Sequence, residues 1–79
     1  MKTKQEVEAE LLHIGDYVVG DVYTTLEFAE QVESGNINSY DGYGRFHDGE
    51  KETDIDVWTH NLFYDEVIAK YPYVIWYNK

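Results

Sequence analysis

Acidic residues occupy every second position of the segment 50–57, and this pattern constrains the fold more than any other feature of the chain. A period of two is typical of a β-strand with one face toward a core and one toward solvent. The preceding pair Asp48-Gly49 is a strong signal for a two-residue type I′ turn, which requires positive φ at both central residues. We therefore predict a β-hairpin in which 43–47 pairs with 50–58.

A two-residue turn fixes the register of this hairpin. The predicted pairs are His47 with Glu50, Phe46 with Lys51, Arg45 with Glu52, and Tyr43 with Asp54. The core-facing residues are then Phe46, Thr53, Ile55 and Val57. The solvent-facing residues are Arg45, His47, Glu50, Glu52, Asp54 and Asp56. A slip of one residue would bury the carboxylates, so the register is strongly specified.

Helices are predicted from capping boxes, in which a Thr caps the helix and a Glu three residues later bonds back to it. The two boxes and their helices are Thr3-Glu6 with residues 4–13, and Thr24-Glu27 with residues 25–34. A third helix is predicted over 60–70, capped by Thr59. Its inward-facing residues are Leu62, Phe63, Val67 and Ile68.

The remaining segments define the fold class. Segments 17–23 and 71–78 are rich in β-branched and aromatic residues and are predicted strands. The order is α-β-α-β-β-α-β, which predicts a two-layer α+β fold with an antiparallel sheet of three or four strands and two or three helices on one face. With 43% hydrophobic and 16% aromatic residues, we expect 1–79 to form a single domain with its own core.

The charge balance excludes several classes of partner. Sixteen acidic residues against six basic ones give a net charge of −10, and no Lys or Arg lies between Gln5 and Gly44. Direct binding to DNA, RNA or anionic lipid needs the opposite sign, so we expect a basic protein partner instead. No apolar run approaches the roughly 20 residues that span a membrane, and the N-terminal residues lack the apolar stretch of a signal peptide. We expect a cytoplasmic monomer.

The sequence gives little support for catalysis or a metal site. Cysteine is absent, and no nucleophile motif is present. Alternate carboxylates on a flat strand stand about 7 Å apart, too far to converge on one ion. The residues His13, His47 and His60 have no spacing useful for zinc. We therefore predict no enzyme activity, no metal and no cofactor.

The acidic residues themselves are the candidate partner-binding site. Four of them form the row on the predicted hairpin: Glu50, Glu52, Asp54 and Asp56. Three more form a stripe on the second helix at about 5–6 Å spacing: Glu27, Glu30 and Glu33. Such rows resemble the repeating phosphates of a nucleic-acid strand. A protein that carries them would be steered to the basic groove of a DNA-binding protein.

The segments TLEFAEQVESG, SYDGYG and VIWYNK are similar to segments of short bacteriophage proteins. The whole chain resembles, in size and charge, the phage-encoded anti-CRISPR inhibitors and other DNA mimics. The resemblance implies a one-domain, non-catalytic inhibitor that acts in the cytoplasm of the infected bacterial host. It would occlude target-DNA (PAM) binding by an effector complex such as Cascade. Anti-CRISPRs share no common motif, so the resemblance assigns no residue.

An aromatic surface is the alternative site. The candidate residues are Tyr40, Tyr43, Tyr71, Tyr73, Trp76 and Tyr77. Tyr and Trp are enriched at interface hot spots, so the protein would be an interaction adaptor whose acidity serves solubility alone. In the last strand either Val74 and Trp76, or Tyr73 and Ile75, would face the core. The salt dependence of partner binding distinguishes the two hypotheses, since only mimicry is strongly screened.

Overall fold

Both predicted capping boxes form in the computed structural model, which describes residues 1–78. In each, the Thr hydroxyl accepts a hydrogen bond from the backbone N–H of the Glu, and the Glu side chain accepts one from the Thr N–H. The helices they start are α1 (Lys4–Glu10) and α2 (Thr25–Glu33). Helix α1 is three residues shorter than predicted, because Leu11 is extended and a strand begins at His13.

The sheet is antiparallel and has four strands. They lie in the order β3 (Asp21–Thr24), β6 (Tyr73–Asn78), β4 (Gly42–His47) and β5 (Glu52–Asp56). The α+β class is therefore confirmed. The last strand in the sequence is central, and it pairs with β3 on one side and β4 on the other.

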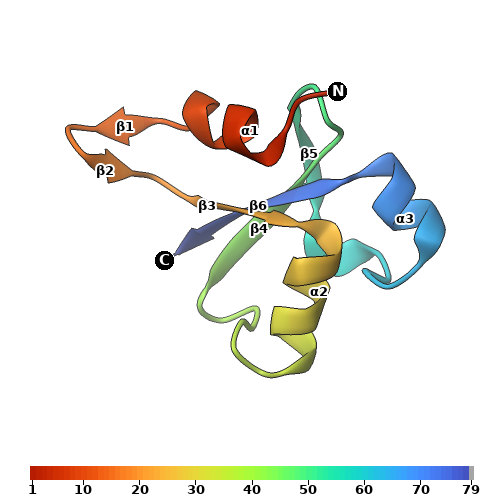
Figure 1. The fold of residues 1–79 in the computed structure, drawn as a ribbon. Helices are drawn as coiled ribbons and strands as arrows, with labels where there is room; N and C mark the ends of the chain where they lie inside the picture. Colours follow the sequence, from red (N-terminus) through yellow and green to blue (C-terminus); the bar gives the residue numbers. More distant parts are fainter. Residues whose placement is uncertain (79) are drawn as a thin grey trace.

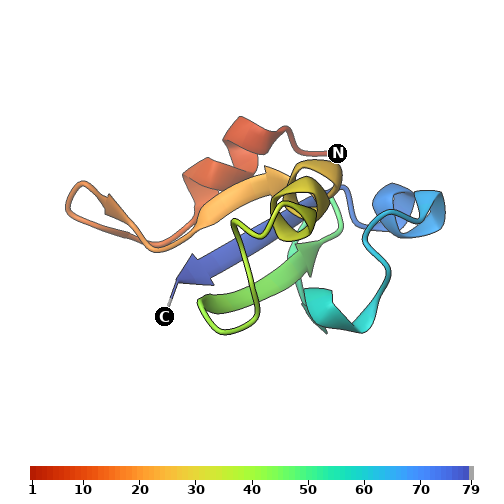
Figure 2. The same cartoon turned by 90° about the horizontal axis from the view of Figure 1, so that it is seen from below.

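A small hairpin precedes the sheet and was not predicted. It consists of β1 (His13–Ile14) and β2 (Tyr17–Val18), joined through Gly15 at φ 62°. The predicted strand 17–23 is thus divided into β2 and β3. Figures 1 and 2 show the hairpin projecting away from the rest of the fold.

Helices cover both faces of the sheet, so the expectation that all helices lie on one face is wrong. Phe28 of α2 packs in a cluster with Val74 and Trp76 of β6. Val7 of α1 packs with Ile75, which points to the other face because side chains alternate along a strand. In Figure 1, α1 and α2 lie on opposite sides of β3 and β6. The two alternate sets of β6 side chains are therefore both covered, one by α2 and the other by α1.

The β4–β5 hairpin forms, but its predicted register is wrong. The structure pairs His47 with Glu52 and Arg45 with Asp56, with an irregularity between them. The carboxylate of Asp48 accepts hydrogen bonds from the N–H groups of Glu50 and Lys51, at 2.8 and 2.9 Å. Those bonds extend the turn to the four residues 48–51. Gly49 has a φ of 97°. Among the described residues only glycines have positive φ, so the φ of Asp48 is negative. The type I′ turn, which needs positive φ at both central residues, is therefore excluded.

His47 was expected to face solvent, yet it is buried with 2% exposure. Its side chain lies on the face that α1 covers, against Tyr73. Its Nδ1 accepts a hydrogen bond from the Gly49 N–H at 3.0 Å. An accepting Nδ1 means that the ring is neutral, and burial lowers its pKa.

The third helix starts later than predicted. A 3₁₀ turn, η1 (Val57–Thr59), follows β5, and α3 covers only Asp65–Lys70. Thr59 does not cap α3, because its hydroxyl donates to the Asp56 carbonyl. Of the predicted inward residues Leu62 is buried, whereas Phe63 is 44% exposed. None of the helices in 1–78 is long and apolar enough to cross a membrane.

Candidate interaction face

Three of the predicted acidic residues share one face of the sheet with two tyrosines and an arginine. We name this set the acidic–aromatic face. It consists of Tyr43 and Arg45 on β4, Glu52, Asp54 and Asp56 on β5, and Tyr77 on β6. It lies on the α1 side of the sheet, beyond the end that α1 covers. Parts of the two rival sites predicted from the sequence thus meet in one place. Tyr71 and Trp76, which were also candidates for the aromatic surface, are instead buried in the core on the α2 side.

Tyr77 connects the aromatic and acidic parts of this face. Its hydroxyl donates a hydrogen bond of 2.5 Å to the Glu52 carboxylate. Its ring stacks on Tyr43 with centroids 4.9 Å apart and an angle of 25° between the planes. Burial, followed by the hydrogen bond to Glu52, raises the pKa of Tyr77 above its usual range. The phenol therefore stays a hydrogen-bond donor at any physiological pH.

Arg45 is the sole arginine of the chain, and its guanidinium interacts with other residues of this face. Its guanidinium lies over the Tyr43 ring at 5.0 Å and contacts the Asp56 carboxylate at 3.4 Å. Asp56 also accepts the Trp58 N–H at 2.7 Å, as the cap of η1. Asp56 is therefore partly neutralised and has a structural role, so it contributes less negative field to the face than the sequence suggests.

Asp54 is the freest carboxylate of the face. It is exposed and has no ion pair with any residue described in the structure. With Glu52 and Tyr77 it lines a groove of about 340 Å³, to which Leu11, Leu12 and Val19 contribute apolar surface. Glu52 and Asp54 therefore stand beside both an aromatic stack and an apolar wall.

Glu50 does not belong to this face. It was predicted in the strand opposite His47, but it lies in the loop 48–51. Its carboxylate contacts the amine of Met1 at 3.3 Å, and Lys2 donates to its backbone carbonyl. The predicted row of four is therefore a row of three plus a loop residue, because the longer turn places Glu50 before the start of β5.

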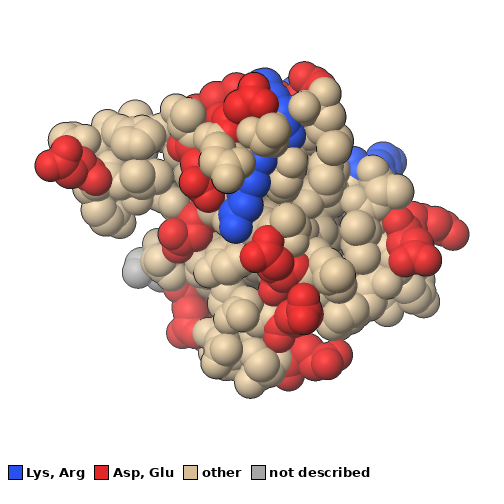
Figure 3. Space-filling view, in the orientation of Figure 1, with Lys and Arg blue, Asp and Glu red and all other residues tan. Residues whose placement is uncertain are grey.

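The three α2 carboxylates occupy a different side of the molecule. Glu27, Glu30 and Glu33 are exposed on the helix that covers the other face of the sheet. In Figure 3 acidic side chains follow the exposed side of α2, with basic side chains at its upper end. Lys4 of α1 contacts Glu27 at 3.7 Å. Hydrogen bonds from Thr24 lower the pKa of Glu27. The α2 stripe and the β5 acids thus do not form one continuous surface.

The chemistry available to the acidic–aromatic face is recognition. Its carboxylates can pair with Lys or Arg side chains, and its tyrosines offer ring surface and a hydroxyl. Within residues 1–78, no three His, Asp or Glu side chains are grouped so as to hold a metal ion.

The sequence predicted Arg45 as a partner of the acids but placed it opposite Glu52, whereas in the structure its guanidinium contacts Asp56. The role of Tyr77 as a partner of Glu52 was missed. That Tyr43 and Arg45 share a face could be read from their separation of two residues on one strand. That β6 is the neighbour of β4 was not readable from the sequence, so the Tyr77–Glu52 contact was not either.

Comparisons with protein-family models, with curated proteins and with solved structures gave no significant match to this chain.

Proposed function

We propose that the protein is a non-catalytic inhibitor that binds the basic, nucleic-acid-binding groove of another protein through the acidic–aromatic face. The observation that carries the proposal is the position of Glu52 and Asp54. Both are exposed on an edge strand, and Arg45 is the one basic residue of the face. A chain of net charge −10 adds a long-range field that attracts such a groove.

The face would act by occupying the place of a nucleic-acid strand. Carboxylates at alternate strand positions, about 7 Å apart on a regular strand, would meet Lys and Arg side chains that otherwise contact phosphates. The stacked rings of Tyr43 and Tyr77 would add apolar contact beside the charges, where bases lie in a nucleic-acid complex. The α2 carboxylates point elsewhere and would contribute to attraction at a distance.

We further propose that the target is a CRISPR effector complex such as Cascade, whose binding of target DNA at the PAM would be occluded. This narrower identity rests on the resemblance to small acidic phage inhibitors. The acidic face supplies the physical means, since CRISPR effectors of the Cas9 type read the PAM with Arg side chains and hold the guide–target duplex in a positively charged channel.

The test is inhibition of target-DNA binding by purified Cascade, measured by gel shift with a PAM-containing duplex. The double variant Glu52→Gln/Asp54→Asn should weaken inhibition by about tenfold or more. The control Glu30→Gln/Glu33→Gln removes the same charge from α2 and should weaken it much less. Equal inhibition by both variants would show that the face is not the site. No inhibition by the unmodified protein would reject the anti-CRISPR identity.

The alternative function, an adaptor that binds through aromatic residues, is favoured by one observation. Tyr43 is 44% exposed although it stacks on Tyr77, so part of the stack is available to a partner. Salt separates the two functions. Mimicry requires affinity to fall steeply between about 50 and about 500 mM salt, whereas an aromatic interface would lose little.

A further inference from the structure

The sheet has a second edge, β3, which lies at the opposite side from β5. Figure 1 looks onto this edge, with α1 and α2 on either side of it. An unpaired strand edge presents backbone N–H and C=O groups that can pair with another chain. Pairing of another strand with the β5 edge is hindered by the irregular register of β5 and by its acidic side chains. Edge β3 has no such irregularity.

The ladder between β3 and β6 shows which backbone groups of β3 point outward. The Thr25 N–H donates to the Pro72 carbonyl at 3.0 Å, in the register that pairs Tyr23 with Val74. Hydrogen-bonded and non-hydrogen-bonded pairs alternate along an antiparallel ladder. The outward groups therefore belong to Val22 and Thr24. The Thr24 N–H donates to the Glu27 carboxylate, whereas neither backbone group of Val22 has a partner on this side within residues 1–78, so both are open to a new strand.

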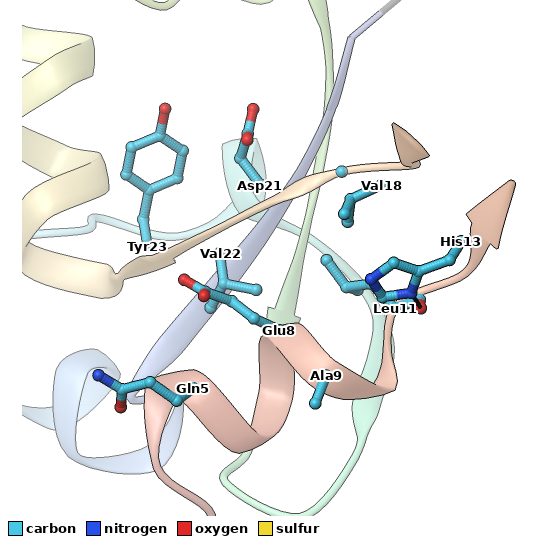
Figure 4. Close-up of a pocket in the computed structure, with 10 residues that line it drawn as sticks. Gln5, Glu8, Ala9, Leu11, His13, Val18, Asp21, Val22 and Tyr23 are labelled. Atoms are coloured by element: carbon cyan, nitrogen blue, oxygen red, sulfur yellow. Dashed lines mark hydrogen bonds between the residues drawn. The ribbon is translucent and has the colours of Figure 1, made fainter. Parts of the chain in front are cut away.

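A groove runs along this edge. It has a volume of about 600 Å³ and is bounded by α1, the β1–β2 hairpin and β3 itself. In Figure 4, Asp21 and Tyr23 project from one side of β3, while Val22 points to the side of α1. Leu11 and Val18 form an apolar wall near the hairpin. The groove can therefore receive side chains on both sides of an added strand.

The charge of the groove is negative and uncompensated. Glu8 and Asp21 line it, no Lys or Arg does, and neither carboxylate has an ion pair with a described residue. Beyond Thr24, Lys4 and Glu27 link the two helices that flank the strand. Such a lining is complementary to an occupant that carries basic side chains and one apolar one.

We propose that this groove binds an extended, basic segment of a partner protein, which adds to the sheet as a fifth strand beside β3. The segment residue opposite Val22 is apolar and faces α1. Its two neighbours are Lys or Arg, and they meet Asp21 and the ring of Tyr23 on the other side. Backbone pairing supplies the affinity, and the alternation of apolar and basic side chains along the segment supplies the selectivity. This site is independent of the acidic–aromatic face.

The test uses two capped peptides on the full chain, Lys-Val-Lys-Val-Lys and Lys-Pro-Lys-Pro-Lys. They have the same charge, but proline removes the N–H groups that a ladder needs. Binding is followed by backbone amide NMR. The valine peptide should shift β3 and α1 amides and, at ten times its Kd, slow exchange of the Val22 N–H by about tenfold. The variant Glu8→Gln/Asp21→Asn should weaken this binding by about tenfold, and Glu30→Gln/Glu33→Gln should leave it nearly unchanged.

Three results would overturn the proposal. Equal shifts from the proline peptide would mean that charge alone attracts the ligand. Shifts centred on Glu52 and Asp54 would place the basic segment on the other edge. Protection of the Val22 N–H without peptide, increasing with protein concentration, would mean that a second copy of this chain covers the edge.

Discussion

The hydroxyl of Tyr77 donates to the carboxylate of Glu52 across an intervening strand, since β4 lies between β6 and β5. This bond ties an edge strand to the centre of the sheet through side chains alone. We expect Tyr77→Phe to lower the free energy of unfolding by about 0.5–1 kcal/mol, as measured by urea denaturation, because the bond is accessible to solvent. Glu52→Gln keeps an acceptor oxygen and should cost less than Tyr77→Phe. The reverse order would mean that the carboxylate charge matters more than the bond.

The same contact makes a prediction about titration. Burial and the hydrogen bond to Glu52 raise the pKa of Tyr77, so its phenol should ionise well above the ordinary range of a tyrosine. An ultraviolet titration of tyrosinate should contain a late step that is absent in Tyr77→Phe. In Glu52→Gln that step should move to lower pH, since the carboxylate no longer opposes a second negative charge. A late step that is unchanged in both variants would disprove the assignment.

Glycine is required at position 42 for a steric reason. A Cβ added to Gly42 would collide with the Tyr77 carbonyl oxygen and lie 2.8 Å from the Trp76 ring. The carbonyl belongs to the paired strand and cannot move without breaking the ladder. We expect Gly42→Ala to lower the free energy of unfolding by about 2 kcal/mol or more. The control Asp41→Ala, one residue away and exposed, should change it by less than about 0.5 kcal/mol.

His47 predicts a loss of stability in mild acid. Its folded pKa lies below the value of about 6.5 in the unfolded chain, chiefly because the ring is buried. Between those two pKa values the unfolded chain binds a proton that the folded chain does not. The free energy of unfolding should therefore fall as the pH drops below about 6.5, by up to about 1.4 kcal/mol per pH unit. The fall ends below the folded pKa, where both states are protonated.

The measurement is the difference between the original chain and His47→Gln in urea unfolding at several pH values. The difference removes the shared effects of the other titrating groups. The original chain should lose more stability on acidification than His47→Gln does. Parallel slopes for the original chain and His47→Gln would show that the ring accepts a proton without cost.

Local signals in the sequence were sufficient for part of the fold. The two Thr–Glu boxes each specify a helix start through contacts three residues apart, and both were predicted. The α+β class was predicted because helical and strand patterns alternate along the sequence. The register of the β4–β5 hairpin was not predictable from Asp48-Gly49, because the Asp48 side chain competes with the two-residue turn by binding two backbone N–H groups.

Features that depend on strand order were out of reach. His47 belongs to the alternate set of strand residues that was predicted to face solvent. It is buried because α1 lies over that end of the sheet. The acids of β5 were predicted to share a face, and three of them do. Their hydrogen-bonded and ion-paired partners depend on β4 and β6 being adjacent in the sheet, which no spacing in the sequence indicates. Glu50 left the row because its position depended on the turn length.

The central place of β6 has a consequence for how the chain acquires its structure. Among the described strands, β3 pairs with β6 alone, and β4 has β6 on one side. During synthesis, residues 21–24 emerge early but have nothing to pair with until 73–78 leave the ribosome. The β4–β5 hairpin can form before that, as a local contact. The sheet is therefore completed in one late step that closes a long loop, the kind of contact that makes folding slow.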